Sequence, residues 1–296
     1  MRFHLAHLSD PHIGPPPRPS WRELAGKRLT GYWNWHTSRH AIHNMAVLEA
    51  ITSDLARTAP DHIILGGDLV NIGMAAEFDL AATRLATLAP PDRMSIVPGN
   101  HDAYVGGSLA AMSTRFGAWM TGDDGEATFP YLRMRDGVAL IGLSSAIPTL
   151  PFLASGALGR AQIDRLDALL PQVRTRARAI VLMIHHPPHR GGARLFRGLR
   201  DAAALEAILA RHGADLIVHG HNHKHSLAHL PGPSGSTIPV VGVASASAIP
   251  GDPAHRAAYH LFTLETTDAG LRISLDVRGM EAPGDPVVLL DRLILR

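Results

Sequence analysis

The chain alternates between short apolar runs and longer amphipathic stretches over most of its length. In residues 38–58, apolar side chains recur every three or four positions, which predicts an amphipathic helix. Similar spacing predicts helices over residues 75–88, 160–170 and 201–212, with Asp201 as the N-cap of the last one. The short apolar runs predict strands over residues 3–8, 62–65, 94–97, 138–143, 180–184 and 216–218.

After residue 220 the helical spacing stops, and three further strands are expected in series. They cover residues 238–244, 259–265 and 271–277. Strands that alternate with helices are typical of βαβ units with parallel pairing, whereas consecutive strands favour antiparallel pairing. The pattern therefore predicts an α/β protein with mainly parallel sheet and a second sheet with antiparallel parts.

Two segments depart from this alternation. Residues 14–36 form an irregular insertion rich in proline, arginine and tryptophan, and residues 280–296 form a Pro/Gly hinge followed by an apolar tail. We expect one domain over residues 1–279 and a tail that packs on it as a last strand or helix. A tail that forms a homodimer or a peripheral membrane contact stays open as an alternative. The insertion begins two residues after His12, a candidate metal ligand discussed below. It is therefore either a substrate lid over the site or a surface loop that closes over the core.

Composition and charge exclude several classes of protein. The 296 residues include no cysteine, which rules out disulfides and thiolate metal sites. A net charge of only +2 argues against a nucleic-acid partner. The N-terminus lacks a signal-peptide h-region and no apolar run reaches about 18 residues, so we expect a cytoplasmic protein. The number of histidines, 19, is unusually high. Their positions in the chain must distinguish surface residues from metal ligands.

Polar residues follow five of the predicted strands directly. Asp10 and His12 follow the first, Asp68 the second, and Asn100 and His101 the third. Two histidine pairs come after later strands: His185 with His186, and His221 with His223. Because ligands bind beyond the carboxyl ends of strands in open α/β sheets, we expect these side chains to share one crevice.

Carboxylate, amide and imidazole groups are suitable ligands for manganese, iron, zinc or cobalt ions. Two such cations about 3.5–4 Å apart can share a carboxylate, activate a water and clamp a phosphoryl group. Glycines at positions 66, 67, 99 and 220 would let the backbone turn tightly beside the metals. The five strand ends together predict a centre with two divalent metal ions.

This ordered set resembles the calcineurin-like metallophosphoesterase family. The blocks are Asp10-Pro-His12, Gly67-Asp68, Gly99-Asn100-His101-Asp102, His185-His186-Pro187 and Gly220-His221-Asn222-His223. The resemblance implies a four-layer αββα sandwich of two mixed β-sheets flanked by helices. It further implies one metal bound by Asp10, His12, Asp68 and His223, and a second bound by Asp68, Asn100, His185 and His221.

In the family pattern, Asp68 would bridge the two metals and His101 would contact the phosphate and protonate or stabilise the leaving oxygen. His185 is preferred over His186 because the family's ligand lies two residues before the proline. The family residue that orients the catalytic histidine has no clear match here, and the sequence leaves Asn71 and Asp102 as alternatives.

Within the family, the resemblance is to the cyclic-nucleotide and glycerophosphodiester phosphodiesterase branch. It implies a metal-dependent phosphodiesterase of small molecules that uses a metal-bridging hydroxide, with 3′,5′-cyclic nucleotides as one substrate class. A pyrophosphohydrolase of a nucleotide-linked lipid or sugar is the alternative, and a protein-binding scaffold of the same fold is the non-enzymatic one. Four residues are candidates for substrate binding: Asn71, Arg190, Arg194 and Arg197.

Overall fold

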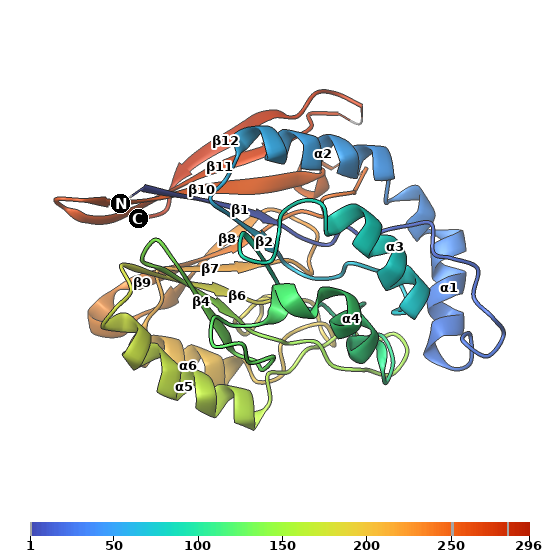
Figure 1. Cartoon of the computed structure of the whole chain (residues 1–296), viewed down its shortest axis with the longest axis horizontal. Helices are drawn as coiled ribbons and strands as arrows, with labels where there is room; N and C mark the ends of the chain where they lie inside the picture. Colours follow the sequence, from blue (N-terminus) through green and yellow to red (C-terminus); the bar gives the residue numbers. More distant parts are fainter. Residues whose placement is uncertain (1, 250–251, 283) are drawn as a thin grey trace.

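Two six-stranded β-sheets lie face to face in the computed structural model, which describes residues 2–249, 252–282 and 284–296 (Figure 1). In spatial order, the first sheet contains β12 (Val288–Ile294), β11 (Gly270–Gly279), β10 (Ala258–Thr267), β1 (Arg2–Leu8), β2 (His62–Leu65) and β3 (Met94–Ile96). The second contains β4 (Tyr131–Arg135), β5 (Val138–Gly142), β6 (Ala179–Met183), β7 (Leu216–His219), β9 (Thr237–Gly242) and β8 (Ser226–Pro231).

Both sheets are mixed. In the first, β1, β2 and β3 run parallel and the other neighbours pair antiparallel. In the second, β5, β6, β7 and β9 run parallel, with β4 and β8 antiparallel at the edges. The parallel strands of each sheet therefore end at a common edge, where the predicted ligands follow them.

Helices complete a four-layer αββα sandwich, as the sequence predicts. Apolar side chains of α2 (Met45–Thr58) and α3 (Ala75–Leu85) join the core around the first sheet, and those of α5 (Arg160–Arg174) and α6 (Ala202–His212) pack on the second. At one end of the molecule lie α1 (Lys27–Thr37) and α4 (Ser108–Phe116) (Figure 1). The described ranges also contain four short 3₁₀ helices: η1 (Arg39–Ala41), η2 (Gly117–Met120), η3 (Pro233–Gly235) and η4 (Pro253–His255).

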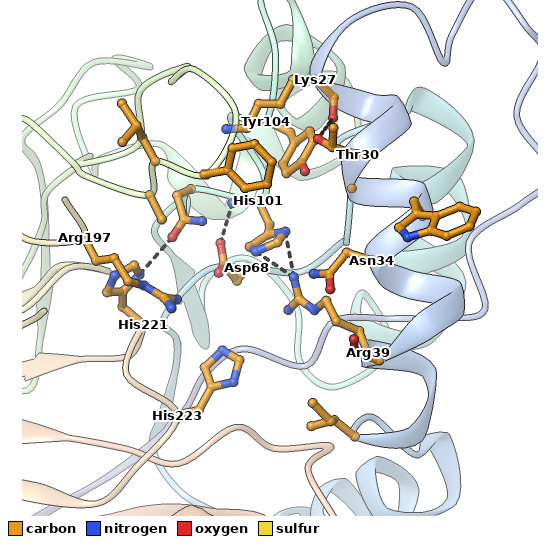
Figure 2. A pocket seen from close by; sticks show the side chains of 18 of the residues that line it. Lys27, Thr30, Asn34, Arg39, Asp68, His101, Tyr104, Arg197, His221 and His223 are labelled. Atoms are coloured by element: carbon orange, nitrogen blue, oxygen red, sulfur yellow. Dashed lines mark hydrogen bonds between the residues drawn. The ribbon is translucent and has the colours of Figure 1, made fainter. Parts of the chain in front are cut away.

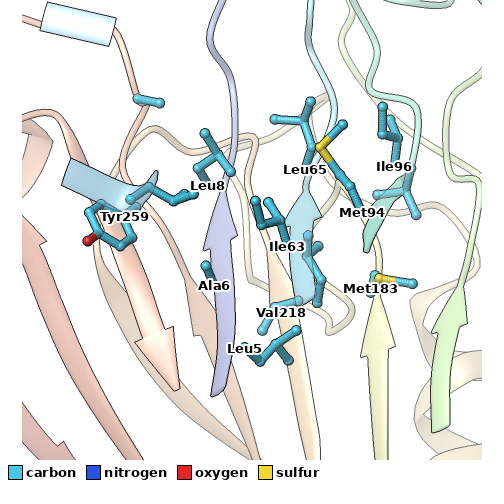
Figure 3. Packing of buried hydrophobic residues seen from close by; sticks show 14 of the residues in the cluster. Leu5, Ala6, Leu8, Ile63, Leu65, Met94, Ile96, Met183, Val218 and Tyr259 are labelled. Atoms are coloured by element: carbon cyan, nitrogen blue, oxygen red, sulfur yellow. The ribbon is translucent and has the colours of Figure 1, made fainter. Parts of the chain in front are cut away.

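Strand β6 shows why the central strands are continuous apolar runs. Its side chains alternate between two cores: Val181 and Met183 face the first sheet, whereas Ile180 and Leu182 face α5 and α6. Figure 3 shows Met183 and Val218 of the second sheet packed near Leu5 and Ile63 of the first. Because both faces are buried, each position must be apolar, and the alternation that marks a half-exposed strand is absent.

Several elements differ from the sequence predictions. The insertion at residues 14–36 contains a helix, α1, where an irregular segment is predicted. The helix predicted over residues 38–58 begins only at Met45, because the side chain of Asn44 accepts hydrogen bonds from the first-turn backbone N–H groups. Asp201 precedes α6, but its carboxylate accepts hydrogen bonds from the backbone of Leu158 and Gly159 instead of capping the helix.

The apolar end of the chain forms β12, which pairs antiparallel with β11 at the edge of the first sheet. It therefore completes a sheet whose other strands come from both ends of the sequence. Within the described ranges, no helix is both long and apolar enough to cross a lipid bilayer.

Many of the histidines are buried far from solvent. Three of them, His7, His62 and His260, lie on β1, β2 and β10 with no exposed surface. Burial lowers the pKa of His7 and of His62 to about 3, and it lowers the pKa of His260 well below its ordinary value. The folded protein therefore keeps these rings neutral at pH values where an unfolded chain would bind protons.

We expect the free energy of unfolding to fall as the pH decreases from 7 to 5. The unfolded rings titrate near pH 6.5, so each buried histidine stabilises the fold fully above that value. Below it, stability is lost at up to about 1.4 kcal/mol per pH unit per histidine until the folded pKa is reached. Urea titrations at several pH values would measure this slope.

His62→Gln should make the slope shallower, because glutamine keeps a hydrogen bond to Ser95 without a titrating group. The matched control is His229→Gln, at an exposed position of β8, which should leave the slope unchanged. An unaltered slope in His62→Gln would exclude His62 as a source of the acid sensitivity.

Candidate metal and phosphate site

The seven predicted metal ligands come together where β1, β2, β3, β6 and β7 end. In a first group, His223 Nε2 lies 3.2 Å from Asp10 Oδ1 and 3.2 Å from His12 Nε2. His12 Nε2 is 3.8 Å from Asp68 Oδ2. Four side chains from three strand ends thus direct one ligand atom each toward a common point, a geometry able to bind one metal ion.

A second group lies on the other side of Asp68. His185 Nε2 is 3.4 Å from Asp68 Oδ2 and 3.3 Å from Asn100 Oδ1, and Asn100 Oδ1 is 2.8 Å from His221 Nδ1. The same carboxylate oxygen of Asp68 therefore faces both groups. This is the position that a ligand shared by two cations must occupy.

Hydrogen bonds to backbone carbonyls fix which nitrogen each of two histidines offers. His12 Nδ1 lies 3.0 Å from the carbonyl of Val70, and His185 Nδ1 lies 2.7 Å from that of Gly66. A carbonyl only accepts, so Nδ1 carries a hydrogen and Nε2 is the nitrogen that faces the site; hydrogen bonds of this kind orient the histidines of metal centres. His186 is different: its two ring nitrogens contact Ser145 and the carbonyl of Ala154. The residues present thus fit a pair of divalent cations, with His185 rather than His186 facing them.

Backbone strain is concentrated in the same residues. Five of the predicted ligands have positive φ angles, which are rare outside glycine: Asp10 (53°), His12 (39°), Asp68 (53°), His221 (67°) and His223 (52°). Such strain is retained where a function requires a particular side-chain direction. Gly99 and Gly220 allow the approach, because a Cβ there would lie 2.2 Å from Asp68 Oδ1 and 2.3 Å from Asp10 Oδ2.

The charges at the centre of the site depend on each other. Burial alone lowers the pKa of His185, but the neighbouring Asp68 outweighs it and raises that pKa to about 9. Burial disfavours ionised Asp68 as well, yet His185 holds the pKa of this carboxyl well below its ordinary value. A cation bound by His185 must therefore displace a proton, so metal affinity should increase with pH.

His101 lies beside this centre and contacts Arg39. Its backbone N–H donates to Asp68 Oδ1 over 2.7 Å, and its Nδ1 donates to the carbonyl of Asn71. Its Nε2 accepts from Arg39 Nη1 over 2.7 Å, while Arg39 Nη2 is 2.8 Å from His12 Nε2. Burial and the Arg39 guanidinium lower the pKa of His101 to about 3.

A cavity of about 900 Å³ opens above His101 (Figure 2). One wall is α1, whose side chains Lys27, Thr30 and Asn34 face the cavity beside Tyr104. The same helix adds Leu29 and Trp33, and further apolar lining comes from Ile42, Phe152 and Leu153. The insertion predicted as a lid or loop therefore supplies a helical wall of the pocket.

A second hollow of about 640 Å³ shares Ile42, Arg197, His221 and His223 with the first. Its other lining residues include Arg194, Lys224 and His255, so it is more basic than the first. The two hollows meet at the predicted metal ligands. A substrate could thus extend from the larger hollow, with its apolar side chains, across the predicted ligands into the smaller one.

The four candidate substrate residues lie in different places. Arg197 lines both hollows and Arg194 lines the second. Arg190 lines neither, and its guanidinium pairs with Glu206 at 2.9 Å. Asn71 is buried, and its amide donates to the carbonyls of Ile13 and His12.

Of the two residues proposed to orient His101, Asn71 does so through its backbone carbonyl. Asp102 instead accepts hydrogen bonds from the backbone N–H groups of Leu69 and Gly99. Asp102 thus holds together the loops that follow β2 and β3, and it does not touch the His101 ring.

Sequence reasoning missed two residues that face the site, Arg39 and His43. His43 groups with His12 and His223 as a third imidazole, and its Nδ1 is 2.8 Å from Ser247 Oγ. Both missed residues lie in the segment before α2, which the sequence assigns to a helix. Asn44 is a typical N-cap, and reading it as one would have placed Arg39 and His43 in a loop near the other ligands.

Comparison with known proteins agrees with this geometry. The profile of the calcineurin-like phosphoesterase family matches residues 3–225. A dimetal phosphatase from Danio rerio is similar in structure, with a TM-score of 0.67 and 15% identity over 98% of this chain and 99% of that one. No protein of curated function matches the sequence significantly.

Two larger proteins share the fold over part of their length. Purple acid phosphatase PPD1 from yellow lupin (Lupinus luteus) has a TM-score of 0.61 and 14% identity over 99% of this chain and 53% of that one. The sulfate thiohydrolase SoxB from Thermus thermophilus has a TM-score of 0.54 and 18% identity over 93% and 56% of the two chains. At these identities, the likeness shows a common fold.

Proposed function

Because this chain belongs to the calcineurin-like phosphoesterase family of metal-dependent hydrolases, we propose that it uses two divalent metal ions to hydrolyse small-molecule phosphodiesters. The metal ions would be manganese, iron, zinc or cobalt. The observation that supports this most is the placement of Asp68 Oδ2 between two groups of ligand atoms. The first metal would be bound by Asp10, His12, Asp68 and His223, and the second by Asp68, Asn100, His185 and His221. The complete ligand set speaks against a purely protein-binding scaffold, and the cytoplasm stays the expected location.

When bound, the two cations would lower the pKa of the attacking water and offset the charge on the phosphoryl oxygens. The side chains contribute the rest. As the water oxygen bonds to phosphorus and the ester P–O bond breaks, the leaving oxygen needs a proton. His101 Nε2 faces the pocket but now accepts from Arg39 Nη1, so it can give a proton only after a bound phosphate has drawn Arg39 Nη1 away and the ring has taken up a proton from solvent. The negative charge of the bound phosphate favours this protonated ring.

Arg39 would bind the phosphoryl group. Its guanidinium is half-buried between His12 and His101, where a charge-assisted hydrogen bond to a phosphate oxygen is strong. The lone pair of His12 Nε2 now accepts a hydrogen bond from Arg39 Nη2. A cation bound to His12 would use this lone pair, and the N–H of Nη2 would then be free to donate to the substrate. Arg39 therefore couples metal binding to phosphate binding.

The two hollows favour one substrate class among those that the sequence leaves open. The larger hollow contains apolar and aromatic side chains beside the cations Lys27, Arg39 and Arg197, and the smaller contains Arg194, Arg197 and Lys224. A nucleotide-linked lipid has an apolar part and a second phosphate that match these compartments, which a compact 3′,5′-cyclic nucleotide does not use. We therefore place the pyrophosphohydrolase of such a lipid beside the cyclic-nucleotide phosphodiesterase as a second candidate.

The test is a substrate panel with metal-free enzyme reconstituted with Mn²⁺, Zn²⁺ or Fe²⁺. We expect bis(p-nitrophenyl) phosphate to be hydrolysed only after reconstitution. An acylated nucleoside-diphosphate conjugate should exceed 3′,5′-cyclic AMP in kcat/KM by at least about tenfold, since its chain is removed from water. Protein that binds two metal ions but hydrolyses no phosphodiester would refute the proposal. A preference for cyclic AMP would remove the second candidate.

A further inference from the structure

Large exposed apolar side chains line the 900 Å³ cavity or lie within two residues of its lining. We call six of them the apolar rim: Leu29 (56% exposed), Trp33 (71%), Leu150 (72%), Phe152 (91%), Leu195 (81%) and Phe196 (64%). Among the described residues, the other exposed large apolar side chains are Trp21 and Ile42, four residues at 288–294 and Leu227. Side chains of this size are rarely left exposed in one cluster without a binding role.

The apolar rim comes from three segments that the structure joins. Leu29 and Trp33 lie one turn apart on α1, so they project from the same side of the helix. Lys27 Nζ at the start of α1 donates to Thr149 Oγ1 over 2.8 Å, which ties the helix to the loop with Leu150 and Phe152. The N–H of Ala154 donates to the carbonyl of Phe196 over 3.1 Å, which ties that loop to the one with Leu195.

Two residues of the apolar rim are held in a strained backbone conformation. Phe152 and Phe196 have φ angles of 67° and 65°, in the left-handed region that bulky side chains rarely adopt. The same two side chains are 91% and 64% exposed, so packing of the rings offsets little of the strain. Strain of this kind is retained where a function needs the side chain presented outward.

The charged side chains at the mouth are basic. Lys27 and Arg197 line the larger hollow, and Arg194, Arg197 and Lys224 line the smaller one. Among the described residues that line either hollow, Asp68 is the only acidic one, and it lies at the metal site. Exposed apolar side chains beside unneutralised cations are what a protein uses to bind the interface of an anionic lipid bilayer.

We propose that the apolar rim docks this protein on the surface of an anionic lipid bilayer, with the mouth of the cavity facing the headgroups. A folded protein seated on the rim would close the entrance, whereas a bilayer can deliver a molecule through it. If the proposed function holds, the substrate is then a phosphate-bearing amphiphile that enters from the bilayer. The docking itself does not depend on catalysis.

The experiment is cosedimentation of the full-length protein with vesicles of phosphatidylcholine alone or mixed with an equal part of phosphatidylglycerol. We expect binding to the anionic vesicles that weakens as salt increases. The triple variant Leu150→Ser/Leu195→Ser/Phe196→Ser should bind at least about tenfold more weakly, because it loses three inserting side chains. Leu227→Ser is the control, at an exposed leucine of β8 that belongs neither to the apolar rim nor to the tail, and should bind like the unmodified protein.

Thermal unfolding of each variant shows whether it is folded. Absence of binding to anionic vesicles, or equal binding by the triple variant, would overturn the proposal. A concentration-dependent dimer lost in the triple variant, without vesicle binding, would assign the apolar rim to a second copy and overturn it as well. Vesicle binding without phosphodiesterase activity would refute the proposed function alone, whereas activity without vesicle binding would refute the docking alone.

Discussion

Replacing Asp68 with asparagine is expected to deplete both metal ions and to lower kcat by several orders of magnitude. One oxygen of Asp68 faces His12 on one side and His185 on the other, at 3.8 and 3.4 Å. An amide is neutral and a poor bridging ligand, so neither cation would be held at its normal affinity. The effect on both sites at once distinguishes Asp68 from a residue that serves one cation.

Metal content per chain, measured by mass spectrometry after reconstitution with Mn²⁺, should fall together with the rate on bis(p-nitrophenyl) phosphate. Asp54→Asn is a matched control, because Asp54 is a buried carboxylate of α2 that pairs with Arg278 far from the site. It should lower stability but retain two metal ions. Two ions and nearly normal activity in Asp68→Asn would show that Asp68 is not the shared ligand.

His101→Ala is expected to retain both metal ions and to lower kcat according to the leaving group. Nδ1 of His101 is occupied by the carbonyl of Asn71, so only Nε2 can pass a proton to a leaving oxygen. General acid catalysis typically contributes about 10²–10⁴-fold. The loss should be of this size for alkoxide leaving groups and small for p-nitrophenolate, which leaves without protonation.

The measurement compares kcat on an alkyl and a p-nitrophenyl ester of the same phosphate, with metal content determined in parallel. His186→Ala is the control: this buried histidine contacts Ser145 and Ala154 and should show no dependence on the leaving group. Equal losses on both esters would make His101 a stabiliser of charge rather than an acid. Loss of a metal ion would make it a ligand.

The predicted strands, and the predicted ligands that follow them, agree with the structure because each depends on a short stretch of consecutive residues. A strand buried on both faces must be apolar at every position, as β6 is, and its end is marked by a change to Gly, Pro, Asp or His. Parallel strands share one edge, so residues far apart in sequence are brought together by pairing alone. The four-layer architecture came from the family resemblance, not from this pattern.

Two of the elements that were missed, α1 and β8, depend on contacts that are not local. Helix α1 contains Thr30, Gly31 and Tyr32, which are weak helix formers, and it has no side-chain N-cap. It is stabilised from outside, because Arg28 donates to the carbonyls of Ile72 and Gly73. Strand β8 is half exposed and was missed for a related reason: its pairing with β9, rather than a run of apolar residues, makes it a strand.

Helix α1 approaches the chemistry of the site through Gly31. A Cβ at this position would lie 2.2 Å from the hydroxyl of Tyr104, whose ring stacks on His101 at 5.5 Å between centroids. Helix α1 therefore packs against Tyr104, and Tyr104 in turn packs against His101. A molecule too large for the cavity cannot displace α1 without tilting the ring that supports His101, so poor fit should reduce turnover as well as binding. Discrimination between substrates would then appear in kcat, and not only in KM.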